Sequence, residues 1–165
     1  MQTLLAKLQP LVPNVSFAEG TSFFWSPKQK LITYRVAKIP NDRDVWALLH
    51  ETAHASLNHT QYNSDFELLM LEVAAWEKAC EIGTELGLPI DEEHIQNCLD
   101  TYRDWVHQRS TCPSCSSTSF QKDPHSYHCH NCQTVWQVSA SRFCRPYRLR
   151  DTSSKAKALP APTFM

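Results

Sequence analysis

The chain has 165 residues, 42% of them hydrophobic, and a net charge of −1, so it is long enough for one core and a small appendage. No apolar run approaches the length that crosses a bilayer, and the start of the chain lacks a basic segment followed by a long apolar stretch. These features argue against membrane and exported proteins. We therefore expect a soluble, cytoplasmic protein.

The small net charge hides two halves of opposite sign. Residues 1–109 carry nine Lys/Arg against fifteen Asp/Glu, whereas residues 110–165 carry seven against two. Such a split indicates modules with different roles. We expect one folded domain at residues 1–109, a second at 110–140, and a basic, flexible tail at 141–165.

The beginning of the chain predicts a short helix and three strands. Residues 3–8 have the pattern of an amphipathic helix, which Pro10 and Pro13 end. Residues 26–30 make a hairpin turn between the last two strands. Three short strands cannot bury themselves, so a helix must cover the sheet. The strands are expected at residues 15–18, 22–25 and 31–36.

Three longer helices follow. Each begins at polar capping residues, and the last has acidic residues in its first turn, which favours the helix dipole. The predicted fold class is therefore α+β, with a short three-stranded sheet of the antiparallel type packed on the first two of these helices. The helices are expected at residues 42–57, 65–87 and 91–109.

The first long helix contains the sequence His50-Glu51-Thr52-Ala53-His54. The i, i+4 spacing puts both imidazoles on one helical face, where they can bind one ion. Zinc suits two neutral imidazoles and a carboxylate, and it keeps a fourth position open for water. Glu51 is offset so that its carboxylate reaches that water as a general base. Because apolar neighbours bury this helix, unpaired polar groups in it would be costly.

Glu72 is the expected third ligand. It is the one carboxylate centred in the apolar stripe of the next helix, where an ionised group must be paired or bound to a metal. A salt bridge from Glu72 to Arg35 or Arg103 is the alternative. The charged side chains on the opposite face are Glu67, Glu77, Lys78, Glu81 and Glu85.

His59 and Asp65 are rival ligands. His59 follows His54 so closely that it folds back only through a tight turn, and Leu57 occupies the position where a glycine would help. The sequence leaves the oxyanion-stabilising residue open among three candidates, which are Tyr62, Tyr102 and His107.

These motifs resemble a known group of enzymes. A His-Glu-x-x-His helix followed by Glu-Val-Ala-Ala-Trp at residues 72–76 is similar to the minigluzincins, a minimal class of gluzincin peptidases. Residues 49–51 and 57–59 also resemble the ImmA/IrrE group of small metallopeptidases, some of which cleave transcriptional repressors. Thr52-Ala53 stands where that group usually has Leu-Gly.

The resemblance covers residues 1–109 and implies a zincin-like domain with zinc-dependent endopeptidase activity on a protein or peptide. It implies that His50, His54 and Glu72 bind the catalytic zinc and that Glu51 acts as base and acid. It also implies that the last strand before the active-site helix binds substrate backbone as an added strand. The residues concerned are Leu31, Ile32, Thr33 and Tyr34.

Cys112 and Cys115 form one Cys-x-x-Cys pair, Cys129 and Cys132 form another, and thirteen residues separate the two pairs. Two such pairs at this distance predict a zinc ribbon, a closed structural site with four thiolates. A redox-active pair is the alternative. The remaining thiols are expected to be core or surface groups: Cys80, Cys98 and Cys144.

Four arginines and two lysines follow the ribbon. A ribbon with a basic tail suits nucleic acid, because the charges reach phosphates and aromatic side chains stack on bases. The alternatives are a simple capping module and a tail that blocks the acidic peptidase domain.

Two other functions compete with a free-standing endopeptidase. A DNA-tethered protease that resembles the SprT-like group is the first, because that group combines His-Glu-x-x-His with a zinc ribbon. The group uses a third histidine, however, and the residue thirteen positions beyond His54 is Glu67. A nucleic-acid-binding or adaptor protein with an inactive peptidase domain is the other alternative. The intact Glu51 argues against it.

Overall fold

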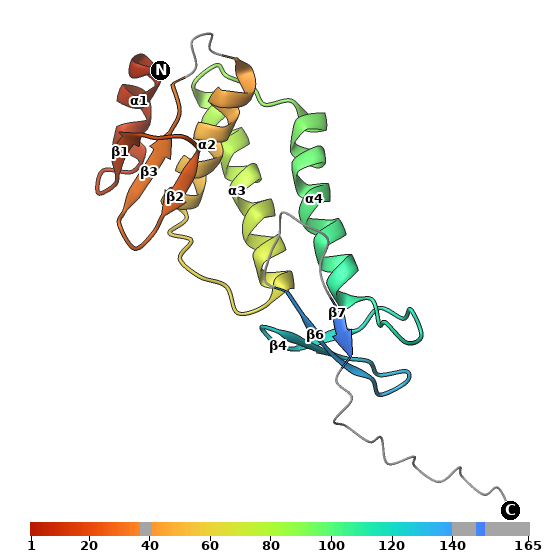
Figure 1. Cartoon of the computed structure of the whole chain (residues 1–165). Helices are drawn as coiled ribbons and strands as arrows, with labels where there is room; N and C mark the ends of the chain where they lie inside the picture. Colours follow the sequence, from red (N-terminus) through yellow and green to blue (C-terminus); the bar gives the residue numbers. More distant parts are fainter. Residues whose placement is uncertain (37–40, 140–147, 151–165) are drawn as a thin grey trace, which may run out of the picture. The chain divides into compact units, whose positions relative to one another are not determined.

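The computed structural model describes residues 1–36, 41–139 and 148–150 (Figure 1). The chain divides into two compact units, Met1–Asp100 and Thr101–Met165. The division falls within the last long helix, whereas the sequence suggested a boundary after Arg109. No helix in the described ranges is both long and apolar enough to span a membrane.

The first unit opens with a short helix, a 3-10 turn and three strands: α1 (Gln2–Leu8), η1 (Gln9–Leu11), β1 (Ser16–Glu19), β2 (Phe24–Ser26) and β3 (Leu31–Tyr34). β3 lies in the middle of the sheet, parallel to β1 and antiparallel to β2. The expected hairpin between β2 and β3 is therefore present. After the hairpin, β3 lies between β2 and β1 and runs parallel to β1. The sheet is therefore mixed and not antiparallel.

Three long helices are present: α2 (Asp42–Ser56), α3 (Asp65–Glu85) and α4 (Glu92–Ser110). Their bounds agree closely with the predicted ones because polar caps define their starts. The Asn41 side chain accepts a hydrogen bond from the Asp44 amide at 2.9 Å. The Ser64 hydroxyl accepts one from the Glu67 amide at 3.1 Å.

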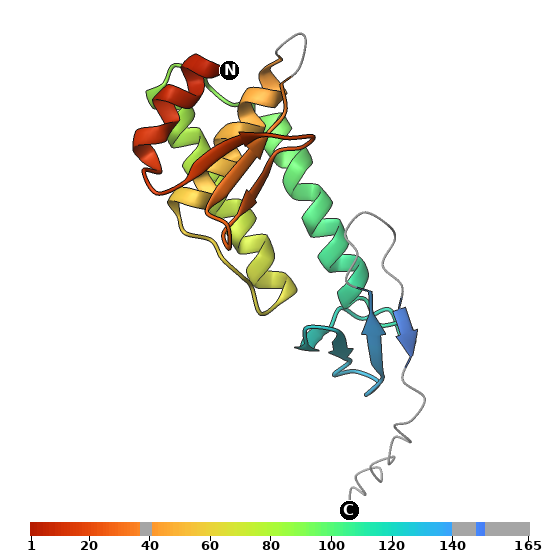
Figure 2. The same ribbon diagram turned by 60° about the vertical axis from the view of Figure 1, so that its left-hand side comes forward.

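α2 lies between the sheet and α3 (Figures 1 and 2). Ala53 on α2 and Ala75 and Ala79 on α3 are completely buried. Small side chains at these positions leave room for larger ones to reach from one helix to the other. The same core includes larger side chains from α1, the sheet, α2 and the first half of α4: Leu8, Ile32, Leu48, Leu49, Ile95 and Leu99.

The second unit contains a four-stranded antiparallel sheet in the order β4 (Phe120–Asp123), β5 (Ser126–His128), β6 (Val135–Val138) and β7 (Arg148–Arg150). β7 pairs with β6, so the sheet extends into the segment that the sequence assigned to a flexible tail. The rest of that tail lies outside the described residues. The fold is thus α+β, with four α-helices and two small sheets among the described residues.

Candidate metal centres

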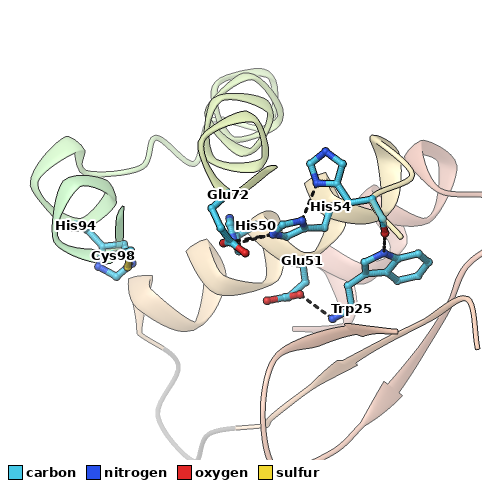
Figure 3. A network of polar contacts seen from close by, with 8 residues as sticks. Trp25, His50, Glu51, His54, Glu72, His94 and Cys98 are labelled. Atoms are coloured by element: carbon cyan, nitrogen blue, oxygen red, sulfur yellow. Dashed lines mark hydrogen bonds and ion pairs between the residues drawn. The ribbon is translucent and has the colours of Figure 1, made fainter. Parts of the chain in front are cut away.

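α2 and α3 bring three predicted ligands together (Figure 3). His50 Nε2 lies 3.2 Å from Glu72 Oε2, and His54 Nε2 lies 3.6 Å from the same oxygen. The two Nε2 atoms are 3.1 Å apart. His50 and His54 share a face of α2 because they are one helical turn apart, and Glu72 reaches them from the buried face of α3.

This donor set fits a metal ion. The three side-chain atoms lie within 4.8 Å of one another, and His50 and Glu72 are buried. Two neutral imidazoles whose lone pairs face each other have no donor to share, whereas one cation satisfies both nitrogens and the carboxylate together. The residues His50, His54 and Glu72 can therefore hold one metal ion.

Two opposing effects act on the pKa of Glu72. Burial would raise this pKa, but the adjacent imidazoles of His50 and His54 outweigh that effect and hold it well below its ordinary value. The alternative salt bridge to Arg35 is not formed, because Arg35 binds the buried carboxylate of Asp44 at 2.6 Å.

His50 also packs on the indole of Trp76, with ring centres 4.1 Å apart and an interplanar angle of 26°. In the described part of the chain, His50 Nδ1 and Trp76 Nε1 are buried nitrogens without a hydrogen-bond partner. On its Nδ1 side, His50 is therefore held by ring stacking and not by a hydrogen bond.

Glu51 points away from the ligand cluster, toward the sheet. Its Oε2 accepts a hydrogen bond of 2.7 Å from the backbone amide of Trp25 in β2 (Figure 3). Since this bond engages one carboxylate oxygen, the side chain is oriented beside the ligands without being one of them. Sequence analysis missed Trp25, because a backbone donor in a strand has no sequence signature.

Leu31–Tyr34, which we expected to bind substrate as an added strand, has no free edge for one. β3 pairs with β1 along its whole length on one side and with β2 on the other, so its backbone groups are already engaged. β2 is an edge strand, and the amide of Trp25 points away from β3 to reach Glu51. The strand edge beside Glu51 thus belongs to β2.

His59 does fold back on His54, contrary to the argument that it lacks a glycine. Asn58 adopts the left-handed conformation with φ 53°, which asparagine tolerates better than most residues. His59 Nδ1 then lies 2.8 Å from His54 Nδ1, on the side of the ring opposite the ligand cluster. Asp65 is buried in the first turn of α3 and is not part of the cluster.

The four predicted ribbon cysteines also converge. Cys112 Sγ lies 3.6 Å from Cys132 Sγ, and Cys115 Sγ lies 3.5 Å from Cys129 Sγ. All four sulfurs lie within 4.8 Å of one another, so they can hold a second metal ion. A closed set of four thiolates has no open position for water, which is typical of structural sites.

Both cysteine pairs have the same turn geometry. The amides of Ser116 and Gln133 donate to the carbonyls of Cys112 and Cys129 at 3.0 and 2.9 Å. Ser116 and Gln133 each have φ 61°, the left-handed conformation that closes the turn. Hydrogen bonds with Ser117 lower the pKa of Cys115, which favours the thiolate that a metal requires.

Of the remaining thiols, Cys80 and Cys98 are not part of either cluster. Cys80 and Cys98 are half-buried thiols, and Cys98 Sγ lies 3.7 Å from His94 Nε2. Burial raises the pKa of both thiols, so they are poor nucleophiles. Cys144 lies outside the described residues.

No protein-family model, curated protein or solved structure matches this chain. The function is therefore inferred from the geometry of the two clusters.

Proposed function

We propose that this protein is a zinc-dependent endopeptidase that hydrolyses peptide bonds of a protein substrate. The observation that carries the proposal is the convergence of His50, His54 and Glu72 beside a carboxylate, Glu51, that is oriented but is not a ligand. This is the arrangement that a zincin-like active site requires. The nitrogen and oxygen donors favour zinc among the common divalent ions.

When bound, zinc would supply Lewis acidity toward the scissile carbonyl and would lower the pKa of water. In this proposal Glu51 removes a proton from the attacking water and passes it to the leaving amine. Its Oε2 is held by the Trp25 amide, so its other oxygen is the one that receives the proton. β2 is the edge strand that we propose for extended substrate backbone, in place of Leu31–Tyr34. The substrate would use groups of this edge other than the Trp25 amide, which Glu51 occupies.

The tetracysteine cluster has a structural role in this proposal. Its ligand set differs from the first centre, so one chain would carry two zinc ions with different chemistry. The SprT-like alternative is less well supported, because the third residue of the first cluster is Glu72 and not a histidine.

Metal analysis tests this two-site proposal. We expect about two zinc ions per chain in the wild type, and about one each in Glu72→Ala and Cys112→Ser. The two variants lose different ions because the ligand sets do not overlap. Elemental analysis of the purified proteins measures the stoichiometry, and digestion of a peptide library with and without a chelator measures hydrolysis. Full zinc content and full hydrolysis in Glu72→Ala would refute the proposed active site.

Nucleic-acid binding is a second candidate function, favoured by an aromatic patch on the ribbon that consists of Phe120, His128 and His130. Phe120 is 77% exposed, and its ring centre lies 5.6 Å from that of His130. The rings of His128 and His130 are 5.3 Å apart. The rings belong to the half of the chain, residues 110–165, that carries excess positive charge, most of it at residues 142–157. Aromatic rings and basic side chains together suit the bases and phosphates of a single strand.

Phe120→Ala should weaken binding of a single-stranded oligonucleotide by about 5- to 150-fold, since stacking on one base contributes about 1–3 kcal/mol. Fluorescence anisotropy at two salt concentrations measures the affinity and its electrostatic part. Phe66→Ala is the matched control, because Phe66 is 66% exposed on α3 in the other unit. Equal weakening by both substitutions, or by neither, would rule out the aromatic patch as a binding surface.

A further inference from the structure

His54 has a partner on each side of its ring. Its Nε2 faces His50 and Glu72 in the ligand cluster, and its Nδ1 lies 2.8 Å from His59 Nδ1. The two rings meet edge to face, with centres 5.0 Å apart and an interplanar angle of 69°. This geometry puts one nitrogen of His59 at hydrogen-bond distance from the nitrogen that His54 does not direct at the cluster.

We infer that His59 is a positioning residue: it accepts a hydrogen bond from His54 Nδ1 and thereby fixes the tautomer and ring orientation that present the Nε2 lone pair to the metal. The inference rests on the proposed metal site and adds a residue to it. His59 is thus the hydrogen-bond partner of one proposed metal ligand, His54.

The direction of the hydrogen bond follows from proton positions. A ligating nitrogen carries no proton, so neutral His54 must carry its proton on Nδ1. His59 Nδ1 is then the acceptor, and the proton of His59 is on Nε2.

The backbone holds His59 in this position from two elements. Its amide donates to the carbonyl of His54 at 3.0 Å, through the turn made by Asn58. Its carbonyl accepts a hydrogen bond of 2.8 Å from the indole of Trp25 (Figure 3). Trp25 also binds Glu51 through its backbone amide, so one residue of β2 positions both His59 and the proposed general base.

The other histidine of the cluster, His50, differs from His54 at its Nδ1 atom. The Nδ1 atom of His50 has no hydrogen-bond partner within the described residues, and its ring rests on Trp76 instead. Oriented partners of metal-bound histidines commonly change metal affinity by about 10- to 100-fold. Loss of His59 should therefore act through His54 alone.

Metal affinity tests the inference in the full chain with its tetracysteine site already loaded. We expect His59→Leu to lower the zinc affinity of the other site by about 10- to 100-fold, measured by competition with a chelating dye. His59→Gln retains an acceptor oxygen and should stay within about threefold of the wild type. His125→Leu, at an exposed histidine of the ribbon, is the control and should leave this affinity unchanged.

Two substitutions of Asn58 separate the imidazole from the turn that carries it. Asn58→Gly keeps the left-handed conformation accessible and should leave zinc affinity unchanged. Asn58→Val strains that conformation and should lower the affinity although His59 is still present. Equal zinc affinity in Asn58→Val and Asn58→Gly would contradict the requirement for this turn.

Nuclear magnetic resonance of the histidine nitrogens reports the tautomer of His54. If His59 only supported the local structure, its replacement would not change this tautomer. With zinc removed only from the His/Glu site, neutral His54 should carry its proton on Nδ1 in the wild type and be a mixture of tautomers in His59→Leu. Wild-type affinity in His59→Leu, or the same tautomer in both proteins, would overturn the inference. A wild type that binds zinc only at its cysteines would instead refute the proposed active site.

Discussion

Glu51→Gln is expected to lower kcat/KM for peptide hydrolysis by about 10²- to 10⁴-fold, the usual contribution of a general base, and to leave the zinc content unchanged. Glu51 is outside the ligand cluster, so its replacement removes no ligand. The glutamine oxygen can still accept the hydrogen bond from the Trp25 amide, so the local structure is preserved. What is lost is the ability to take up a proton.

The measurement compares steady-state hydrolysis of a cleavable peptide by zinc-loaded proteins, with elemental analysis of the same samples. Glu77→Gln is the matched control, since Glu77 is exposed on α3 and should leave hydrolysis unchanged. Undiminished hydrolysis in Glu51→Gln would exclude Glu51 as the base. A wild type that binds a protein partner but never hydrolyses it would favour the adaptor function over the peptidase.

The first ligand set was predictable because helical periodicity reports which face of a helix is buried. His50 and His54 follow from their spacing on α2, and Glu72 follows from its place in the apolar stripe of α3. Two buried helices that pack together must bring such groups within reach of each other. The capping residues Asn41 and Ser64 fixed the starts of these helices in the same way.

The sheet was less predictable, because alternating side chains do not encode which strand lies beside which. The hairpin turn identified β2 and β3 as neighbours, but the parallel pairing of β1 with β3 depends on the path of the chain. Because of that pairing, Leu31–Tyr34 is the central strand, and β2 is an edge strand. The proposed substrate edge changed with it.

The role of His59 was missed for a different physical reason. The absence of glycine argued against a tight return, yet Asn58 supplies the left-handed residue one position after Leu57. Residues other than glycine also take the left-handed conformation in the ribbon. Ser116 does so in one cysteine turn, and Gln133 does so in the other. The cysteine spacing alone was enough to predict the cluster, because four convergent ligands constrain the backbone more than any single residue preference.

Cys129→Ser is expected to unfold the ribbon while the first unit remains folded. The buried apolar cluster of the ribbon is small and includes two of the proposed ligands: its members are Cys112, Tyr127, Cys129, Trp136 and Val138. A core of this size cannot offset the entropy of ordering the segment, whereas zinc binding to such sites contributes about 10–16 kcal/mol. The first unit has a separate and larger apolar core, so its fold does not depend on this metal.

Hydrogen exchange resolved by residue measures this difference. In Cys129→Ser the amides of β5 and β6 should lose protection, and the stacked rings of Tyr127 and Trp136, whose centres are 5.5 Å apart, should lose their contact. The amides of α2 should remain protected. Glu72→Gln is the reciprocal control, because it should remove the other metal and leave β5 and β6 protected. Persistent protection of the ribbon in Cys129→Ser would mean that Arg109 is a sufficient anchor without metal, since it is buried against Trp105 and accepts the indole hydrogen bond of Trp136 at its carbonyl.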